Sequence, residues 1–357
     1  MLHLLRVILR FIGEKIGWHR IGFVISVAII ATAAVVLYRT LHDLNMSDLV
    51  RAFHDIKSRN ILLAGLAVAA GYFTLTFYDL FALRTIGRKD VPYRIAALAG
   101  FTSYSVGHNV GASVFTGTAV RYRIYSASGL SAIEVAKISF IAGLTFWLGN
   151  ITVLGSGFFY EPAAASAINQ LPEWFNRALA TLALLALIIY VGWVWSAPRV
   201  LGRNDWKVTL PGGPLTLLQI VIGIIDLGFC ALAMYMLLPQ SPYIDFVALT
   251  VIFVTATLLG FASHSPGGLG VFDAAMLIAL GQFEKEELLA GLLLFRLLYY
   301  ITPFALALLI LGGREIVKGM SATKVQPLHP IATNVLAPEA KRPRKKTGAK
   351  KRNARSR

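Results

Sequence analysis

Apolar runs of about twenty residues recur along the whole of this 357-residue chain. A run of that length crosses a hydrocarbon layer of roughly 30 Å as one helix. Hydrophobic residues make up 56% of the sequence and charged residues only 15%, a balance that soluble domains rarely reach. Because only helices and closed barrels satisfy their backbone groups in lipid, the sequence predicts an all-α polytopic integral membrane protein.

About eight hydrophobic segments are predicted, and two of them are interrupted by polar residues and glycines. The interrupted segments either cross the membrane as broken helices or re-enter on the side from which they came. The first segment is too long for the core of a signal peptide, so it is predicted to be an uncleaved span. The predicted segments are 21–38, 60–82, 92–118 (interrupted), 136–157, 176–196, 215–238, 245–281 (interrupted) and 287–311.

The chain is predicted to consist of a basic leader (1–20), a transmembrane domain (21–315) and a disordered basic tail (316–357). The leader mixes basic and apolar residues at helical spacing, which suits an amphipathic helix on the membrane surface, and a plain cytoplasmic leader is the alternative. Ten Lys and Arg residues lie between 341 and 357. They either attract anionic lipid or act as a solvated topology anchor. Nucleic acid is not expected as a partner.

The distribution of Lys and Arg predicts that both termini are cytoplasmic. If both interrupted segments re-enter, the cytoplasmic loops and termini hold 27 of the 34 Lys and Arg residues, and the opposite side holds six. Without the tail the ratio is still 14 to six. Positive residues concentrate in cytoplasmic loops, so the predicted arrangement is a multi-pass membrane protein with both termini in the cytoplasm.

The stretch "SHSPGGLGVFD" at 263–273 is unusual at the end of an apolar run. Pro266 cannot continue a helix, and Gly267, Gly268 and Gly270 weaken one. Non-helical backbone at membrane depth must be buried in protein or line a water-filled cavity. The stretch is therefore predicted to break a helix inside the membrane.

A second polar stretch, "SYSVGHNVGASVFTGTAV" at 103–120, predicts a second break. Both stretches contain His-x-x-Gly, starting at His108 and at His264, which favours an internal inverted repeat over coincidence only weakly. Paired broken helices are typical of transport sites, because the N-termini of half-helices attract anionic groups. Close helix packing is the alternative reason for the glycines.

Charged residues inside the spans are the next candidates. Arg296 lies mid-span, where a charge costs at least about 2.5 kcal/mol, so it needs an acid or an anionic ligand. Asp226 and Asp273 are the candidate acids, and a lipid headgroup is the alternative partner. Asp79 and Glu134 lie closer to the ends of spans and are expected to be hydrated.

For the other polar residues of the interrupted segments, the sequence allows two interpretations each, one functional and one structural. Arg121 and Arg123 either receive a phosphate or anchor the cytoplasmic end of a span. His108 and His264 either contact a headgroup or are core residues with satisfied hydrogen bonds. Cys230 is the only cysteine, which excludes an intramolecular disulfide, and the histidines lack ligand spacing, so no metal site and no cofactor are expected.

Three segments together resemble the membrane domain of the lysylphosphatidylglycerol synthase/flippase (multiple peptide resistance factor) family and the stand-alone membrane proteins grouped with it. They are "GHNVGASVFTGTAVRYRIY", "SHSPGGLGVFDAAML" and "FRLLYYITPFALAL", within a similarity that covers about 20–315. The resemblance implies broken helices and movement of aminoacylated phospholipid between leaflets. It implies a site formed by Pro266, Gly267, Gly268, Gly270, Asp273, Arg296, Tyr299 and Tyr300, with a looser match at His108, Gly111, Thr116, Gly117, Arg121 and Tyr122.

The sequence together with this resemblance leads to the hypothesis of a lipid translocase of the bacterial inner membrane, without an aminoacyl-transferase domain and therefore not an enzyme. Its partners would be an anionic or aminoacylated phospholipid, the membrane and a lipid synthase, with oligomers allowed. A scaffold for a lipid-modifying synthase and a membrane enzyme acting on lipid-linked substrates are the alternatives. No G-x-x-x-x-G-K-[ST] motif is present, so ATP is not expected to drive transport. The predicted substrate-binding residues are His108, Asn109, Gly111, Thr116, Arg121, Arg123, Asp226, His264, Pro266, Gly267, Gly268, Gly270, Asp273, Arg296, Tyr299 and Tyr300.

Overall fold

The computed structural model describes residues 46–203 and 206–323. The predicted leader at 1–20 and the first span at 21–38 lie outside the described residues, as does the greater part of the predicted tail, 324–357. Residues 316–323, predicted to be disordered, are helical. The chain divides into two units, 1–313 and 314–357, and the fold below is that of the first.

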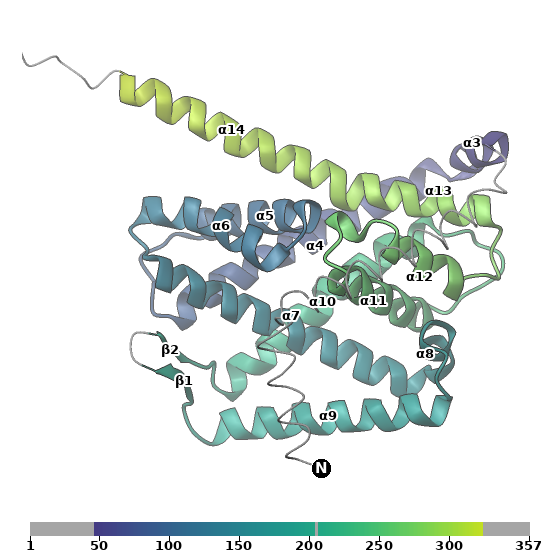
Figure 1. Ribbon diagram of the computed structural model, residues 1–357, viewed down its shortest axis with the longest axis horizontal. Helices are drawn as coiled ribbons and strands as arrows, with labels where there is room; N and C mark the ends of the chain where they lie inside the picture. Colours follow the sequence, from purple (N-terminus) through teal and green to yellow (C-terminus); the bar gives the residue numbers. More distant parts are fainter. Residues whose placement is uncertain (1–45, 204–205, 324–357) are drawn as a thin grey trace, which may run out of the picture. The chain divides into compact units, whose positions relative to one another are not determined.

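Five helical segments of the described residues are long and apolar enough to cross a membrane, which confirms the predicted uninterrupted spans from residue 60 onward. The last of them is a helix with one wider π-helical turn, η4, in its middle. The segments are α4 (Ser58–Thr85), α7 (Ala132–Tyr160), α9 (Glu173–Ser196), α10 (Gly213–Leu237) and the run of α13 (Lys285–Arg296), η4 (Leu297–Ile301) and α14 (Thr302–Thr323), shown in Figure 1.

The first interrupted segment forms a helical hairpin, called hairpin 1, of α5 (Tyr93–Val110) and α6 (Ser113–Tyr125). Its register is antiparallel. A Cβ on Gly107 would lie 3.2 Å from the carbonyl oxygen of Ser113, and one on Gly117 would lie 3.3 Å from that of Ser103. Small residues allow this close approach of backbones, and the hairpin returns toward the side where it began.

The second interrupted segment also forms a hairpin, called hairpin 2. It consists of α11 (Phe246–Ala262), the short η3 (Pro266–Gly268) and α12 (Val271–Ala279). A Cβ on Gly260 would lie 3.2 Å from the Cα atom of Gly268, so the two arms meet closely beside the turn. Both predicted breaks are therefore present, and each is the turn of a helical hairpin.

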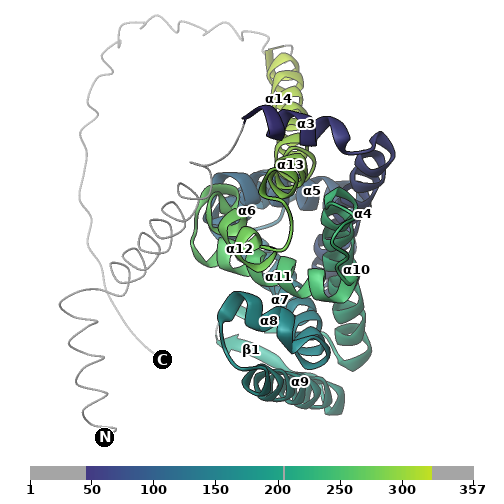
Figure 2. The same ribbon diagram turned by 90° about the vertical axis from the view of Figure 1, so that its right-hand side faces the viewer.

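The two halves of the structure repeat one order of elements: a long helix, a hairpin and a long helix. In the first half these are α4, hairpin 1 and α7, and in the second half α10, hairpin 2 and α13. The long helices α4 and α10 pack side by side (Figure 2). Gly71 on α4 faces Cys230 on α10, and Tyr78 on α4 contacts Asp226 on α10. Residue numbers thus rise along α4 where they fall along α10, so the two helices are antiparallel. The corresponding helices α4 and α10 thus run in opposite directions, which agrees with the inverted-repeat hypothesis.

The helix α7 joins the two halves by close packing. A Cβ on Gly149 would lie 2.7 Å from the Cα atom of Gly223, and Gln219 donates a hydrogen bond to the hydroxyl of Thr145 at 2.7 Å. In these two contacts the residue numbers rise in the same direction along both helices, so α7 and α10 run parallel. Glycine at both contact points is what allows the backbones to touch.

A two-stranded antiparallel sheet was not predicted, because the sequence at 198–213 was interpreted as a loop. Strands β1 (Val200–Arg203) and β2 (Trp206–Thr209) pair with Val200 opposite Thr209. The sequence interpretation also missed three short helices in the connections between spans. These are α3 (Met46–Asp55), η2 (Ser126–Ser128) and α8 (Pro162–Asn169).

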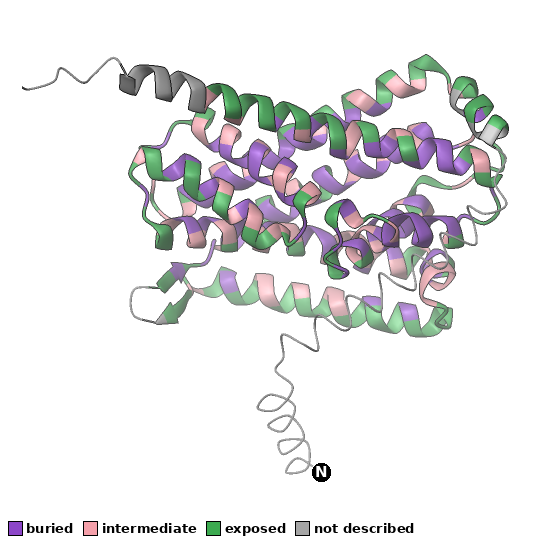
Figure 3. Ribbon diagram, turned by 45° about the horizontal axis from the view of Figure 1, so that its top comes forward, coloured by how far each residue is buried: buried purple, intermediate pink, exposed green. Residues whose placement is uncertain are grey.

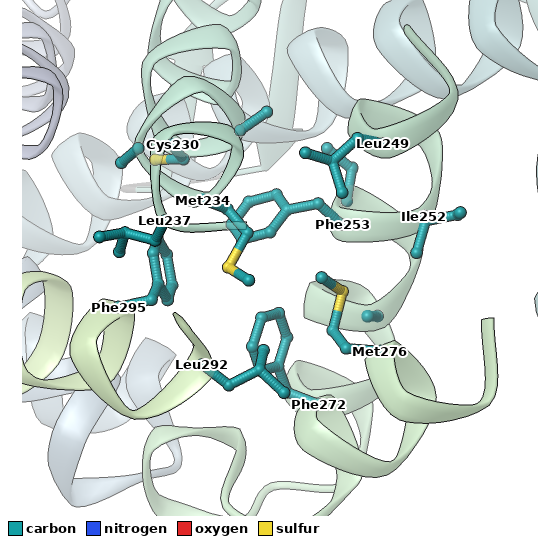
Figure 4. Packing of buried hydrophobic residues seen from close by; sticks show 14 of the residues in the cluster. Cys230, Met234, Leu237, Leu249, Ile252, Phe253, Phe272, Met276, Leu292 and Phe295 are labelled. Atoms are coloured by element: carbon teal, nitrogen blue, oxygen red, sulfur yellow. The ribbon is translucent and has the colours of Figure 1, made fainter. Parts of the chain in front are cut away.

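The hydrophobic core lies between α4, α10, hairpin 2 and α13. Figure 4 shows how the rings of Phe253, Phe272 and Phe295 meet there, with Met234 and Met276 beside them. The ring centroids of Phe253 and Phe295 are 5.3 Å apart and the two ring planes are nearly perpendicular, a favourable aromatic arrangement. This packing fixes hairpin 2 against α13 and so positions the site described below.

The helix α9 is exposed along most of its length (Figure 3). Only Asn176, Ala180 and Val194 are buried on it among 24 residues. Its exposed side chains are mainly Leu, Ile and Trp. A helix so apolar and so exposed fits contact with lipid rather than with water.

Candidate functional site

The turns of the two hairpins meet each other inside the bundle. We call residues 111–112 tip 1 and residues 263–270 tip 2. A Cβ on Gly111 would lie 3.2 Å from the carbonyl oxygen of His264 and 3.5 Å from the nitrogen of Pro266. Gly267 in turn lies beside the carbonyl oxygen of His108. The two polar stretches that the sequence singled out are therefore neighbours in space, although about 150 residues separate them.

Local hydrogen bonds satisfy much of the backbone at tip 2. The hydroxyl of Ser263 donates to the carbonyl of Gly260 at 2.7 Å and accepts from the N–H of Ser265 at 3.2 Å. The N–H of Gly270 donates to the carboxylate of Asp273 at 3.1 Å. Non-helical backbone inside a membrane requires such partners, because lipid supplies none.

An ion pair between α13 and α12 holds tip 2 in place. Arg296 donates from Nε to Oδ1 of Asp273 at 2.9 Å and from Nη2 to Oδ2 at 2.5 Å. Its Nη1 donates to the carbonyl oxygen of Gly267 at 3.0 Å. Both charged residues are buried. Of the partners considered for Arg296, the structure selects Asp273, and Asp226 lies elsewhere.

The π-helical turn η4 presents two consecutive tyrosines toward the same space. Such turns leave carbonyl groups without their usual helical partners. Tyr72 donates its hydroxyl to the carbonyl of Tyr299 at 3.0 Å, and Asn109 donates to the carbonyl of Tyr300 at 3.1 Å. Side chains from α4 and α5 thus stabilise η4, and the sequence pattern alone did not predict this turn.

A second buried ion pair joins α6 to α4. Arg121 donates from Nε and Nη2 to the carboxylate of Asp79, with distances from 2.8 to 3.1 Å, and Tyr125 donates to the same carboxylate at 2.9 Å. Asp79 is fully buried. The expectation that Asp79 would be hydrated is therefore wrong, because hairpin 1 covers it. Glu134 is partly exposed and binds Arg88 at 2.8 Å.

A cavity of about 240 Å³ lies where the two tips meet. Its lining is mostly apolar and aromatic, from α4, α5, α6, α7, α10, hairpin 2 and η4. Val114, Phe115 and Trp147 line it and are also exposed, so it reaches the surface of the described part beside α6 and α7. Its polar lining includes Ser103, Tyr104, His108, Arg121, Asp226 and Ser265.

Two buried polar atoms of the cavity lining have no hydrogen-bond partner. They are Oδ1 of Asp226 and Nδ1 of His108. The other carboxylate oxygen of Asp226 accepts a hydrogen bond from Tyr78 at 3.1 Å. Buried polar atoms are nearly always paired, so two such atoms in one cavity indicate a place for water or a ligand.

The structure brings nine of the sixteen predicted site residues to the cavity wall. They are His108, Gly111, Arg121, Asp226, His264, Gly267, Gly268, Tyr299 and Tyr300. The other seven do not line it, and five of these have structural roles around the tips: Asn109, Thr116, Gly270, Asp273 and Arg296. Pro266 and Arg123 are exposed.

Several lining residues were missed by the sequence analysis, above all Tyr104 and the aromatic wall of Phe146 and Trp147. For Tyr104 a signal existed. It precedes His108 by four residues, and a helix places residues at that spacing on one face. For α7 no such signal existed, because an aromatic residue that lines a cavity looks the same in sequence as one that faces lipid.

The fold and the site define the class of this protein: a polytopic α-helical membrane protein with two helical hairpins whose turns meet beside a cavity. No known family model matches the chain. It is 28% identical over 307 residues to the uncharacterized protein slr0712 of Synechocystis, a match that covers 85% of this chain and 95% of that protein. It is 27% identical over 251 residues to the inner membrane protein YbhN of Escherichia coli, covering 68% and 76%.

The chain is also similar to the phosphatidylglycerol lysyltransferase of Staphylococcus aureus. The identity is 23% over 290 residues, which cover 80% of this chain but only 33% of that protein. The resemblance to the lysylphosphatidylglycerol synthase family noted from the sequence is thereby confirmed. This chain spans about a third of the lysyltransferase, so that protein's activity is not transferred to it.

Proposed function

We propose that this protein moves an anionic or aminoacylated phospholipid between the leaflets of the bacterial inner membrane. The observation that carries the proposal is the cavity between the two hairpin tips, which combines an apolar wall with a few buried polar groups. A lipid headgroup passing through a membrane needs such polar groups, whereas its acyl chains remain in lipid.

The relatives support the choice of a lipid as the substrate. One is named as a transferase of phosphatidylglycerol, and another as an inner membrane protein. In our proposal both termini lie in the cytoplasm, as the distribution of Lys and Arg predicts. Hairpin 1 then enters from the cytoplasmic side and hairpin 2 from the opposite side.

Arg121 would contact the phosphate. Among the described residues that line the cavity, it is the one Lys or Arg. Its guanidinium stacks on Tyr104 at 4.9 Å from the ring centroid, and Asp79 holds its Nε and Nη2 edge. Arg296 would act indirectly, because all three of its guanidinium nitrogens bind Asp273 and Gly267. It would keep tip 2 in the shape that forms the cavity wall.

The test is leaflet exchange of labelled phosphatidylglycerol and labelled lysylphosphatidylglycerol in proteoliposomes. Gly143 lines the cavity, and a Cβ there would meet no atom within 4 Å, so Gly143→Phe is the variant chosen to narrow the cavity with a large side chain. Gly192 on α9 is equally open but does not line the cavity, so Gly192→Phe is the matched control. We expect exchange by the wild type and the control, and its loss in Gly143→Phe. Exchange by Gly143→Phe at the wild-type rate would refute the proposal.

A further inference from the structure

The wall of the cavity includes one acidic residue, Asp226, that takes part in neither of the two buried ion pairs. We propose that Asp226 binds and releases a proton as an anionic phospholipid enters and leaves the cavity, so that lipid and proton move together. This inference rests on the proposed lipid transport. It adds the coupling ion and the residue that carries it.

Three aspartates are buried in the described residues, and they differ in their partners. Asp79 binds Arg121 and Asp273 binds Arg296, each through two or more hydrogen bonds from a guanidinium group. Asp226 forms no salt bridge among the described residues, and it is only 4% exposed. A charge buried in an apolar place needs a partner of opposite charge or must be neutralised. Because the described residues offer Asp226 no cation, a proton is the neutralising partner.

The groups that face Asp226 from the neighbouring elements are nearly all neutral donors. Tyr72 and Tyr78 approach from α4, Tyr104 from α5, Tyr299 from η4, and Cys230 lies one turn further along α10. The cavity wall adds His108, His264 and the guanidinium of Arg121, which Asp79 already neutralises. This set supports a carboxyl group that is neutral when the cavity holds no charge.

Water can reach Asp226 through the cavity. A volume of about 240 Å³ holds several water molecules, each of which occupies about 30 Å³ in the liquid. The unpartnered Oδ1 of Asp226 and the unpartnered Nδ1 of His108 both border this space. Protons can therefore exchange with the cavity without any opening of the ion pairs.

Charge repulsion would supply the coupling. An anionic phosphate beside Arg121 and an ionised Asp226 would share one small apolar cavity, where like charges repel far more strongly than in water. The lipid therefore enters when Asp226 is protonated, and by linkage a bound lipid favours the bound proton. One proton moving with one singly charged lipid carries no net charge across the membrane.

The first experiment detects the proton itself and does not depend on transport. Infrared difference spectra recorded across a pH titration show the carbonyl stretch of a protonated carboxylic acid. We expect this band in the wild type, its loss in Asp226→Asn and its return, shifted, in Asp226→Glu. Unchanged spectra in Asp226→Asn would overturn the inference. Size-exclusion profiles of the variants confirm that each is folded.

The second experiment measures coupling in proteoliposomes with labelled phosphatidylglycerol and the membrane potential clamped to zero. A pH difference of one unit should maintain about a tenfold difference in the lipid between leaflets, since one unit is a tenfold proton ratio. In Asp226→Asn the leaflets should remain equal, and Asp226→Glu should restore part of the asymmetry. Wild-type exchange that ignores the pH difference refutes the coupling alone. If the wild type shows no lipid exchange even when the pH is equal on both sides, the proposed transport itself is refuted instead.

Discussion

Asp273 on α12 holds Arg296 on α13 through two hydrogen bonds of 2.9 and 2.5 Å, and the third guanidinium nitrogen binds the carbonyl of Gly267. One arginine thus connects a spanning segment with both the turn and the returning arm of hairpin 2. The pair lies outside the cavity wall but sets the shape of that wall.

Removing Arg296 should destabilise the protein strongly. Arg296→Ala leaves the buried carboxylate of Asp273 without its partner, and breaking such a pair costs about 3–5 kcal/mol. Arg296→Lys should restore little, because lysine cannot reproduce the planar two-point contact. Thermal unfolding in detergent measures both variants. The double variant Arg296→Ala/Asp273→Asn should lose less stability than the sum of the losses in the two single variants. Full additivity of the two losses would contradict the pairing.

The contact between the two tips should be sensitive to one added methyl group. Gly111 has a φ of +83°, and its Cβ would lie 3.2 Å from the carbonyl of His264. Gly111→Ala should therefore cost about 1–3 kcal/mol of stability through strain and also crowd tip 2. Gly129 also has a positive φ of +77° but open space around it, and its ψ of 18° lies in the left-handed helical region, whereas the ψ of 176° at Gly111 lies in a region that glycine alone adopts readily. Gly129→Ala should therefore cost less than Gly111→Ala, and equal effects of the two variants in thermal unfolding would contradict this geometry of tip 1.

The parallel packing of α7 and α10 should fail when the glycine contact is enlarged. Gly149→Ala places a methyl group 2.7 Å from the Cα atom of Gly223, and a backbone cannot yield as a side chain can. Overpacking of this kind costs about 1–3 kcal/mol. The control is Gly143→Ala on the same helix, whose Cβ meets no atom within 4 Å. The unfolding temperature in detergent should fall for Gly149→Ala and not for Gly143→Ala. Equal unfolding temperatures of the two variants would argue against the close contact.

The loop between α4 and α5 contains a pH-sensitive contact outside the spans. Arg88 donates to both carboxylate oxygens of Asp90 at 3.0 Å, and these hydrogen bonds hold the pKa of Asp90 below its usual value. A lowered pKa means that the contribution to stability exists above the pKa of the unfolded state and disappears as the pH falls through the folded value. NMR titration should show a higher pKa for Asp90 in Arg88→Gln. An unchanged pKa would contradict this contact.

Most elements of the fold were predictable because membrane insertion imposes length and polarity on the chain. The predicted span at 215–238 matches α10 (Gly213–Leu237) within two residues at each end. The breaks were predictable for a related reason, since Pro266 and the glycines around it cannot continue a helix. The strands β1 and β2 and the helix α8 were missed, because they lie in connections where lipid imposes no pattern.

The site was only partly predictable. The sequence indicated that His108 and His264 mark corresponding breaks, and the structure places both at one cavity. It did not distinguish Asp226 from Asp273 as the partner of Arg296. Residues in a sequence carry no record of which helices will face each other, and an ion pair depends on that arrangement.

The sequence by itself determined that this is a helical membrane protein with two broken segments, because hydrophobic length and helix-breaking residues act locally along the chain. Only the tertiary structure decided that the two breaks meet, that Arg296 pairs with Asp273 and that Asp226, beside a cavity, has no cationic partner in the described part of the chain. These outcomes depend on the packing of α4, α10 and the hairpins, in which glycines far apart in the sequence determine how closely the backbones approach.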